Sequence, residues 1–149
     1  MKPEHIAAAF TIDGSIVSVE PYGMGHINDT FLVTAAKRYI MQRINTTLFT
    51  DPDALIDNIR LVTEHAAKKM PGEKVLTLVP TQKGAYLLRD GEHVYRMYDF
   101  IERTECFQTA DRAHFARSGA VFGRFTAALD DFDATQLVDI LPKFHDTRK

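Results

Sequence analysis

Two alternating apolar runs flank a short polar segment near the start of the chain, and this arrangement constrains the fold more than any other feature. Such runs, separated by a few residues that include glycine, predict two strands joined in a hairpin. The connecting segment, residues 22–30, lacks the Asn-Gly or Asp-Gly pair that a tight structural hairpin prefers. The runs are Ile16, Val17 and Val19 before the segment and Phe31, Leu32 and Val33 after it.

The segment is rich in glycine and in short polar side chains. Gly23 and Gly25 lie two residues apart and are followed by His26, Asn28 and other polar residues. Glycine lets the backbone approach a ligand closely, and successive N–H groups can form a concave site for an anion such as phosphate. The segment is therefore a candidate phosphate site, with an ordinary turn as the alternative.

Local signals predict further elements on both sides of this hairpin. Proline at a first-turn position predicts a short helix over residues 3–10. Thr50, Asp51 and Pro52 predict the start of a second helix, which ends at Pro71-Gly72 and carries an apolar face. The residues of that face are Leu55, Ile59, Val62 and Ala66. The predicted strands are Ser15–Tyr22, Thr30–Ala36, Arg38–Ile44, Val75–Val79, Ala85–Arg89 and His93–Ile101.

The pattern changes after Glu102. A polar link over residues 103–109 leads to a helical period over 111–129 and a second helical piece over 134–141. The predicted organisation is a strand-rich part over residues 1–102 and a helical part over 103–149.

Composition limits the classes of function. With 149 residues, 45% of them apolar, the chain can bury a core of its own. A net charge of −2 gives no basic surface for nucleic acid, and no run approaches the ~20 apolar residues that cross a membrane. Cys106 is the one cysteine, which excludes a disulfide framework and favours a reducing, cytoplasmic location.

The order of the elements is that of a protein-kinase nucleotide lobe: a glycine-containing hairpin, a third strand, a helix, more strands, and a polar link into helices. The predicted fold class is therefore α+β, with a five- or six-stranded antiparallel sheet and one packed helix. The first helices of a carboxyl-terminal lobe follow.

Several motifs resemble those of the N-acetylhexosamine 1-kinases, in the aminoglycoside phosphotransferase and choline kinase superfamily. The resemblance covers almost the whole chain, as its amino-terminal part. Its motifs lie in residues 22–30, 38–45, 51–55, 58–65, 98–102, 122–125 and 142–147.

The resemblance implies an ATP- and Mg²⁺-dependent phosphotransferase that acts on the anomeric hydroxyl of a sugar. Family members are more than twice as long, and their catalytic base and metal ligands lie in the second lobe, which we expect beyond Lys149. We expect no catalytic residue and no metal ligand in this chain, which alone would be inactive. The alternatives are a kinase of the same superfamily for choline, homoserine or an aminoglycoside, and a free-standing nucleotide-binding module.

The resemblance also implies roles for individual residues. Gly23, Gly25 and Asn28 would lie at the ATP phosphates, and His26 would reach the sugar or the transferring phosphate. The backbone carbonyl of Asp99 and the amide of Ile101 would hold adenine, in a cleft shared with residues 22–30. Met97 would form the back of the adenine pocket, with an ordinary position in the core as the alternative.

Phosphoryl transfer also requires a cation on the third strand. The family pattern places Gln42 there, whereas a shift of one residue gives Arg43. Side chains of a strand alternate between its faces, so only one of the two can face the nucleotide. Charge favours Arg43 and register favours Gln42; we lean towards Arg43.

The helix over residues 52–70 lacks a carboxylate that faces the sheet. At 100° per residue, Asp57 and Glu64 lie opposite the apolar face, in solvent. Asn58 is the candidate partner of the third-strand cation, with a local surface role as the alternative. The helical part carries aromatic residues at core-like spacing, and any left exposed would favour self-association. They are Phe115, Phe122, Phe125 and Phe132.

Overall fold

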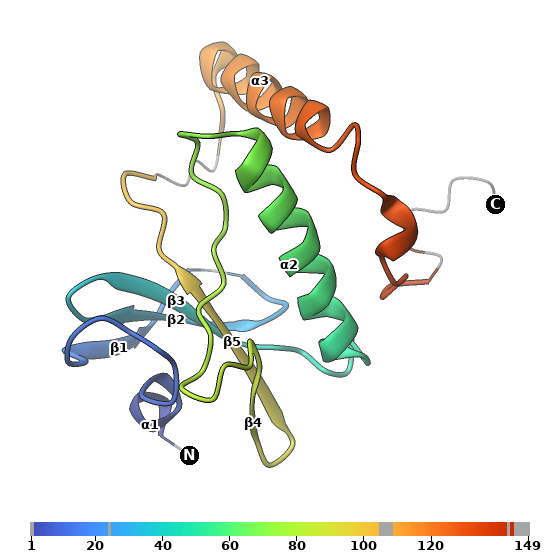
Figure 1. The fold of residues 1–149 in the computed structure, drawn as a ribbon. Coiled ribbons are helices and arrows are strands. Elements are labelled where there is room, and N and C mark those ends of the chain that lie inside the picture. Colours follow the sequence, from blue (N-terminus) through green and yellow to red (C-terminus); the bar gives the residue numbers. More distant parts are fainter. Residues whose placement is uncertain (1, 24, 105–108, 143, 145–149) are drawn as a thin grey trace.

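The computed structural model describes residues 2–23, 25–104, 109–142 and 144. Its five strands form one antiparallel sheet in the order β1-β2-β3-β5-β4 (Figure 1). The predicted α+β fold is confirmed, while Cys106 lies outside the described residues. In chain order the elements are α1 (Pro3–Ala7), β1 (Ser18–Pro21), β2 (Asp29–Thr34), β3 (Arg38–Arg43), α2 (Pro52–Lys69), β4 (Leu88–Asp90), β5 (His93–Asp99), α3 (Arg112–Ala128) and the 3₁₀ helix η1 (Ala134–Gln136).

Several predicted elements are shorter in the structure, and two of them are reduced to a single bridge or turn. Of the strand expected over residues 75–79, only Leu78 pairs, through one isolated bridge to Tyr98 of β5. Pro80 follows and has no N–H to continue a ladder. The helix expected over residues 134–141 is a single 3₁₀ turn, because the segment after it is extended at Leu137.

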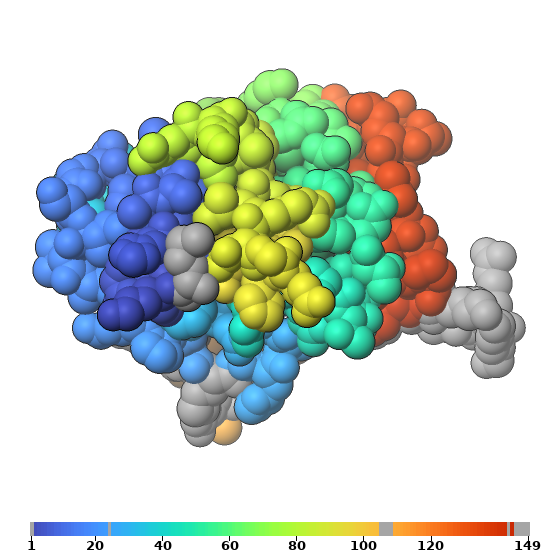
Figure 2. Space-filling view, turned by 90° about the horizontal axis from the view of Figure 1, so that it is seen from below, coloured from blue at the N-terminus to red at the C-terminus, as the bar shows by residue number. Residues whose placement is uncertain are grey.

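One face of the sheet, which we call the α1 face, packs against the amino-terminal helix. Alternation along β2, β3 and β5 brings Val33, Met41 and Met97 to this face, where Ile6 and Phe10 cover them. All five side chains are almost inaccessible to solvent. Figure 2 shows the amino-terminal residues in dark blue beside the yellow atoms of β4 and β5.

The opposite face, the α2 face, packs against the long helix. A smaller cluster forms there from Ile44, Leu55 and Val94. The helix begins as predicted, because the Asp51 carboxylate accepts a hydrogen bond from the Ala54 amide at 2.9 Å. α2 lies between the sheet and the segment over residues 129–142 (Figure 1).

The carboxyl-terminal helix α3 contacts α2 and leaves aromatic side chains in solvent. Phe115 is 77% exposed and Phe122 is 72% exposed, so part of this aromatic surface is bare, whereas Phe125 and Phe132 are half-buried. The physical reason is that α2 is the main neighbour of α3 among the described elements. Self-association through these residues stays a prediction. Within the described ranges, no helix has the length and apolarity that a membrane span needs.

The α1 face predicts the effect of removing a core side chain. Met41→Ala should lower the free energy of unfolding by about 2–5 kcal/mol, because a fully buried side chain leaves a cavity. Urea denaturation measures this change. The control Val17→Ala removes a side chain that is 77% exposed and should change stability by less than about 0.5 kcal/mol. Equal losses in the two variants would contradict this view of the core.

Candidate functional site

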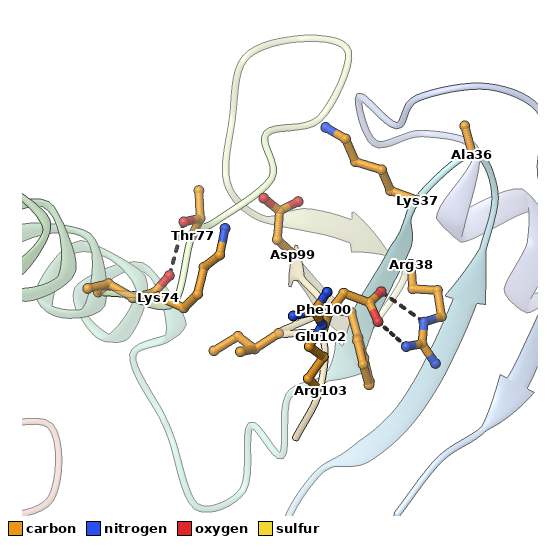
Figure 3. A pocket seen from close by; sticks show the side chains of 11 residues that line it. Ala36, Lys37, Arg38, Lys74, Thr77, Asp99, Phe100, Glu102 and Arg103 are labelled. Carbon is orange, nitrogen blue, oxygen red and sulfur yellow. Dashed lines mark hydrogen bonds and ion pairs between the residues drawn. The ribbon is translucent and has the colours of Figure 1, made fainter. Parts of the chain in front are cut away.

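A cavity of about 710 Å³ lies at the carboxyl end of β5 (Figure 3). Its walls are the β2–β3 turn, the segment over residues 74–77 and the chain that leaves β5. Asp99 and Ile101, the residues expected to hold adenine through their backbone, both line it. The Asp99 amide donates to the Thr77 carbonyl at 3.0 Å, which holds two of these walls together.

Charged side chains surround this cavity. Arg38 Nε donates to Glu102 Oε1 at 3.0 Å, a second bond joins the same two groups, and the guanidinium lies 4.2 Å from the centre of the Phe100 ring. The hydrogen bond from Arg38 holds the pKa of Glu102 below its usual value and raises that of Arg38. The pair therefore fastens the chain that leaves β5 to β3.

The amino-terminal loop holds another wall of the cavity. The Asp13 carbonyl accepts from the Ala36 amide at 3.1 Å, and the Asp13 carboxylate pairs with Lys37 at 2.6 Å. Gly14 has a φ of +79°, and a Cβ atom there would lie 3.0 Å from the Ala36 Cβ. Only glycine fits this position easily. Residues 13 and 14 thus fix the β2–β3 turn.

A second cavity, of about 440 Å³, lies beside the glycine segment. Gly23, Gly25 and Asn28 line it, together with Arg43. Gly23 has a φ of +79°, and a Cβ atom built on either glycine would meet nothing within 4 Å. The backbone therefore has open space beside it, as a phosphate cradle requires. His26, the candidate sugar contact, is exposed in the same segment.

Three side chains at the end of the glycine segment tie it to β3. Asn28 Oδ1 accepts from the Asn45 amide at 2.9 Å, and Thr30 Oγ1 accepts from Gln42 Nε2 at 3.0 Å. Arg43 Nε donates to Asp29 Oδ2 at 2.6 Å. Asn28 thus braces the hairpin through its side-chain oxygen.

The glycine segment and the end of β5 contact each other through two aromatic rings. The rings of Tyr22 and Phe100 are 5.9 Å apart between centres and nearly perpendicular. The two cavities have no lining residue in common. The single cleft expected between these segments is thus divided in this chain, with an aromatic contact joining its two parts.

The sheet register separates the two candidates for the third-strand cation. Arg43 belongs to the α1 face with Met41, pairs with Asp29 and lines the glycine cavity. Gln42 belongs to the α2 face, where it lies opposite Thr30 on β2 and Arg96 on β5. The structure places Arg43 near Gly23 and Gln42 near Arg96.

The structure places two other candidate residues away from the expected contacts. Met97 does not line the cavity at β5 and belongs to the core of the α1 face, the alternative that the sequence left open. Asn58 does not reach β3. Its amide nitrogen donates to the Val138 carbonyl at 2.7 Å, and its oxygen accepts from the Val138 amide at 3.0 Å. Asn58 therefore holds the segment after η1 against α2.

The other expectations for α2 agree with the structure. Asp57 and Glu64 are exposed, and both pair with Arg60 on the same helix. Neither a role for Arg96 nor the contact between Tyr22 and Phe100 was predicted from the sequence. Arg96 alternates with buried Tyr95 and Met97, and this break in an apolar strand was the available signal.

The Arg38–Glu102 pair predicts a pH-dependent contact. Because the folded-state pKa of Glu102 is lowered, the pair contributes to stability above the usual Glu pKa of 4.5 and is lost as the pH falls through the lower folded-state value. Arg38→Gln should raise the Glu102 pKa, as followed by NMR of the side-chain carboxyl carbon. The control Arg89→Gln removes a guanidinium that pairs with Asp53 and should leave the Glu102 titration unchanged. An unaltered midpoint in Arg38→Gln would rule out the pair in solution.

Comparison with known proteins places the fold. No protein-family model matches the chain. An aminoglycoside phosphotransferase from Alicyclobacillus acidocaldarius superposes with a TM-score of 0.66 at 17% sequence identity, over 94% of this chain and 39% of that protein. Spectinomycin phosphotransferase APH(9)-Ia, solved in complex with ADP and spectinomycin, gives a TM-score of 0.47 at 14% identity, over 64% of this chain and 28% of that protein. The chain has the fold of the amino-terminal lobe of a kinase-like phosphotransferase.

Proposed function

We propose that this chain is the nucleotide-binding part of an ATP-dependent phosphotransferase whose acceptor is the anomeric hydroxyl of an N-acetylhexosamine. One observation carries the proposal. In a fold similar to an aminoglycoside phosphotransferase over 94% of the chain, the open glycine segment contacts the end of β5 through Tyr22 and Phe100. A nucleotide lobe needs its phosphate cradle and its adenine contact within one nucleotide's reach of each other.

The residues present fit a nucleotide. The glycine segment offers open space beside Gly23 and Gly25, and the cavity at β5 has mixed charge and an aromatic wall. ATP would supply the transferred phosphoryl group. In this chain the glycine backbone would hold its phosphates, and the backbone at Asp99 and Ile101 would hold its base. Catalysis would then rest on positioning and on neutralising phosphate charge.

The proposed ligands of Mg²⁺ and the proposed catalytic base lie outside this chain. Among the residues described, no group of three or more His, Cys, Asp or Glu side chains could hold a metal ion. The chain spans 39% of the phosphotransferase that it matches, so most of that protein's length has no counterpart in these residues.

The acceptor follows from the resemblance of the segment over residues 22–30 to the N-acetylhexosamine 1-kinases. His26 is exposed in this segment and is the candidate contact to the sugar. The structural neighbour is named for aminoglycosides, which makes an aminoglycoside hydroxyl the second candidate acceptor.

Nucleotide binding provides the first test. The titration calorimetry signal of ATP should be lost or strongly weakened in Gly25→Val, because a branched side chain would fill the space where the backbone approaches phosphate. The structure itself has room for this side chain, so the fold should persist. The control Gly123→Val, also in open space but on α3, should bind ATP like the unmodified chain. Undiminished binding by Gly25→Val would refute the role of the glycine segment.

The acceptor is tested with the complete product of the reading frame that contains residues 1–149. Phosphate transfer from ATP should be fastest to an N-acetylhexosamine with a free anomeric hydroxyl. Transfer should vanish with the matching methyl glycoside, in which that hydroxyl is blocked. Activity on the methyl glycoside, or a preference for an aminoglycoside, choline or homoserine, would replace the proposed acceptor.

A further inference from the structure

Arg96 is a cation on the α2 face whose described hydrogen-bonding partner is uncharged. It extends from the middle of β5, is half-buried, and donates through Nε at 3.1 Å and Nη2 at 2.8 Å to one atom, Gln42 Oε1. A guanidinium has five N–H donors, so this amide oxygen engages only part of its capacity.

The charge of Arg96 is not balanced within the described part of the chain. Burial lowers the pKa of its guanidinium, and the only charge interaction that opposes this effect comes from the Tyr98 phenol. A half-buried charge without a counter-ion is costly, and in proteins such charges are normally paired. Arg96 differs in this respect from five other arginines of the same chain, which pair with carboxylates: Arg38, Arg43, Arg60, Arg89 and Arg124.

A chain of hydrogen bonds connects Arg96 to the end of the glycine segment. Thr30 on β2, Gln42 on β3 and Arg96 on β5 lie opposite one another in the sheet register. Gln42 donates to Thr30 with its nitrogen and accepts from Arg96 with its oxygen, so both ends of its amide are engaged. Gln42 is thereby fixed in one orientation, and it fixes the guanidinium in turn.

Neither candidate for the cation on β3 supplies an unbalanced charge on this face. Gln42 is neutral, and Arg43 lies on the α1 face with its charge balanced by Asp29. Arg38, four residues before Gln42 on the same face of β3, is balanced by Glu102. An anion that reaches the α2 face near Thr30 would therefore meet Arg96 as the nearest cation along this row of side chains.

We propose that Arg96 of β5, oriented by Gln42, is the cation that binds the polyphosphate of the nucleotide. The inference rests on the proposed function for its ligand, and it moves the phosphate-binding charge from the third strand of the sheet to the fifth. Gln42 is a positioning residue in this arrangement. The bound phosphate would supply the counter-charge that the described residues do not.

The test compares three probes by titration calorimetry: ATP, inorganic tripolyphosphate and adenosine. Arg96→Gln should weaken ATP and tripolyphosphate about 10- to 100-fold, the range for a hydrogen bond to a charged group, and leave adenosine unchanged. Arg96→Lys keeps the positive charge without the forked N–H donors, so it should lose less affinity for ATP and tripolyphosphate than Arg96→Gln. Arg89→Gln, which removes an arginine on neighbouring β4, is the matched control and should bind all three probes normally.

A swapped variant guards against misfolding. Gln42→Arg combined with Arg96→Gln keeps one amide and one guanidinium in the same row and should recover tripolyphosphate binding relative to Arg96→Gln alone. Circular dichroism and the urea midpoint establish that each variant is folded. A folded swap with no recovery contradicts the proposal.

The outcomes separate this inference from the proposed function. If Arg96→Gln binds ATP and tripolyphosphate as tightly as the unmodified chain, the role of Arg96 fails while nucleotide binding stands. The unmodified chain could bind tripolyphosphate through Arg96 and yet bind ATP no more tightly than tripolyphosphate. In that case the anion site stands and the nucleotide function fails. If the unmodified chain binds neither tripolyphosphate nor ATP, both fail.

Discussion

The antiparallel pairing of β3 with β5 is the interaction on which the rest of the structure depends. Successive residue pairs in this ladder point their side chains to alternate faces of the sheet. Met41 and Met97 face α1 and close the larger core, while Gln42 and Arg96 face α2 and stay polar. The same register thus produces a dry face that stabilises the fold and a half-buried face that can meet a charged ligand.

This division explains what could be predicted from the sequence. The start of α2 depends on a few neighbouring residues, and it occurs where local signals place it. The segment over residues 75–79 has the composition of a strand, yet its pairing depends on how much of the β5 edge remains available beside it. Propensity describes a segment's preference and not its neighbours.

The candidate site was predictable in outline and not in its partners. The segments around Gly23 and Asp99 were found because glycine spacing and element order are properties of the chain itself. The choice between Gln42 and Arg43 needed the register, because adjacent strand residues face opposite ways: Arg43 lines the cavity beside Gly23, and Gln42 lies opposite Arg96. Asn58 lies on a helix surface, and its partner, Val138, is 80 residues away.

The clamp between Asp13 and the β2–β3 turn has a consequence for how such a protein could change. Residues 13 and 14 lie outside the hairpin, yet they set the position of Ala36 and Lys37, which line the cavity at β5. Substitutions at residues 13 and 14, in the loop after α1, would then reshape the mouth of this cavity while every lining residue stays the same. This loop would tune ligand preference without contacting the ligand.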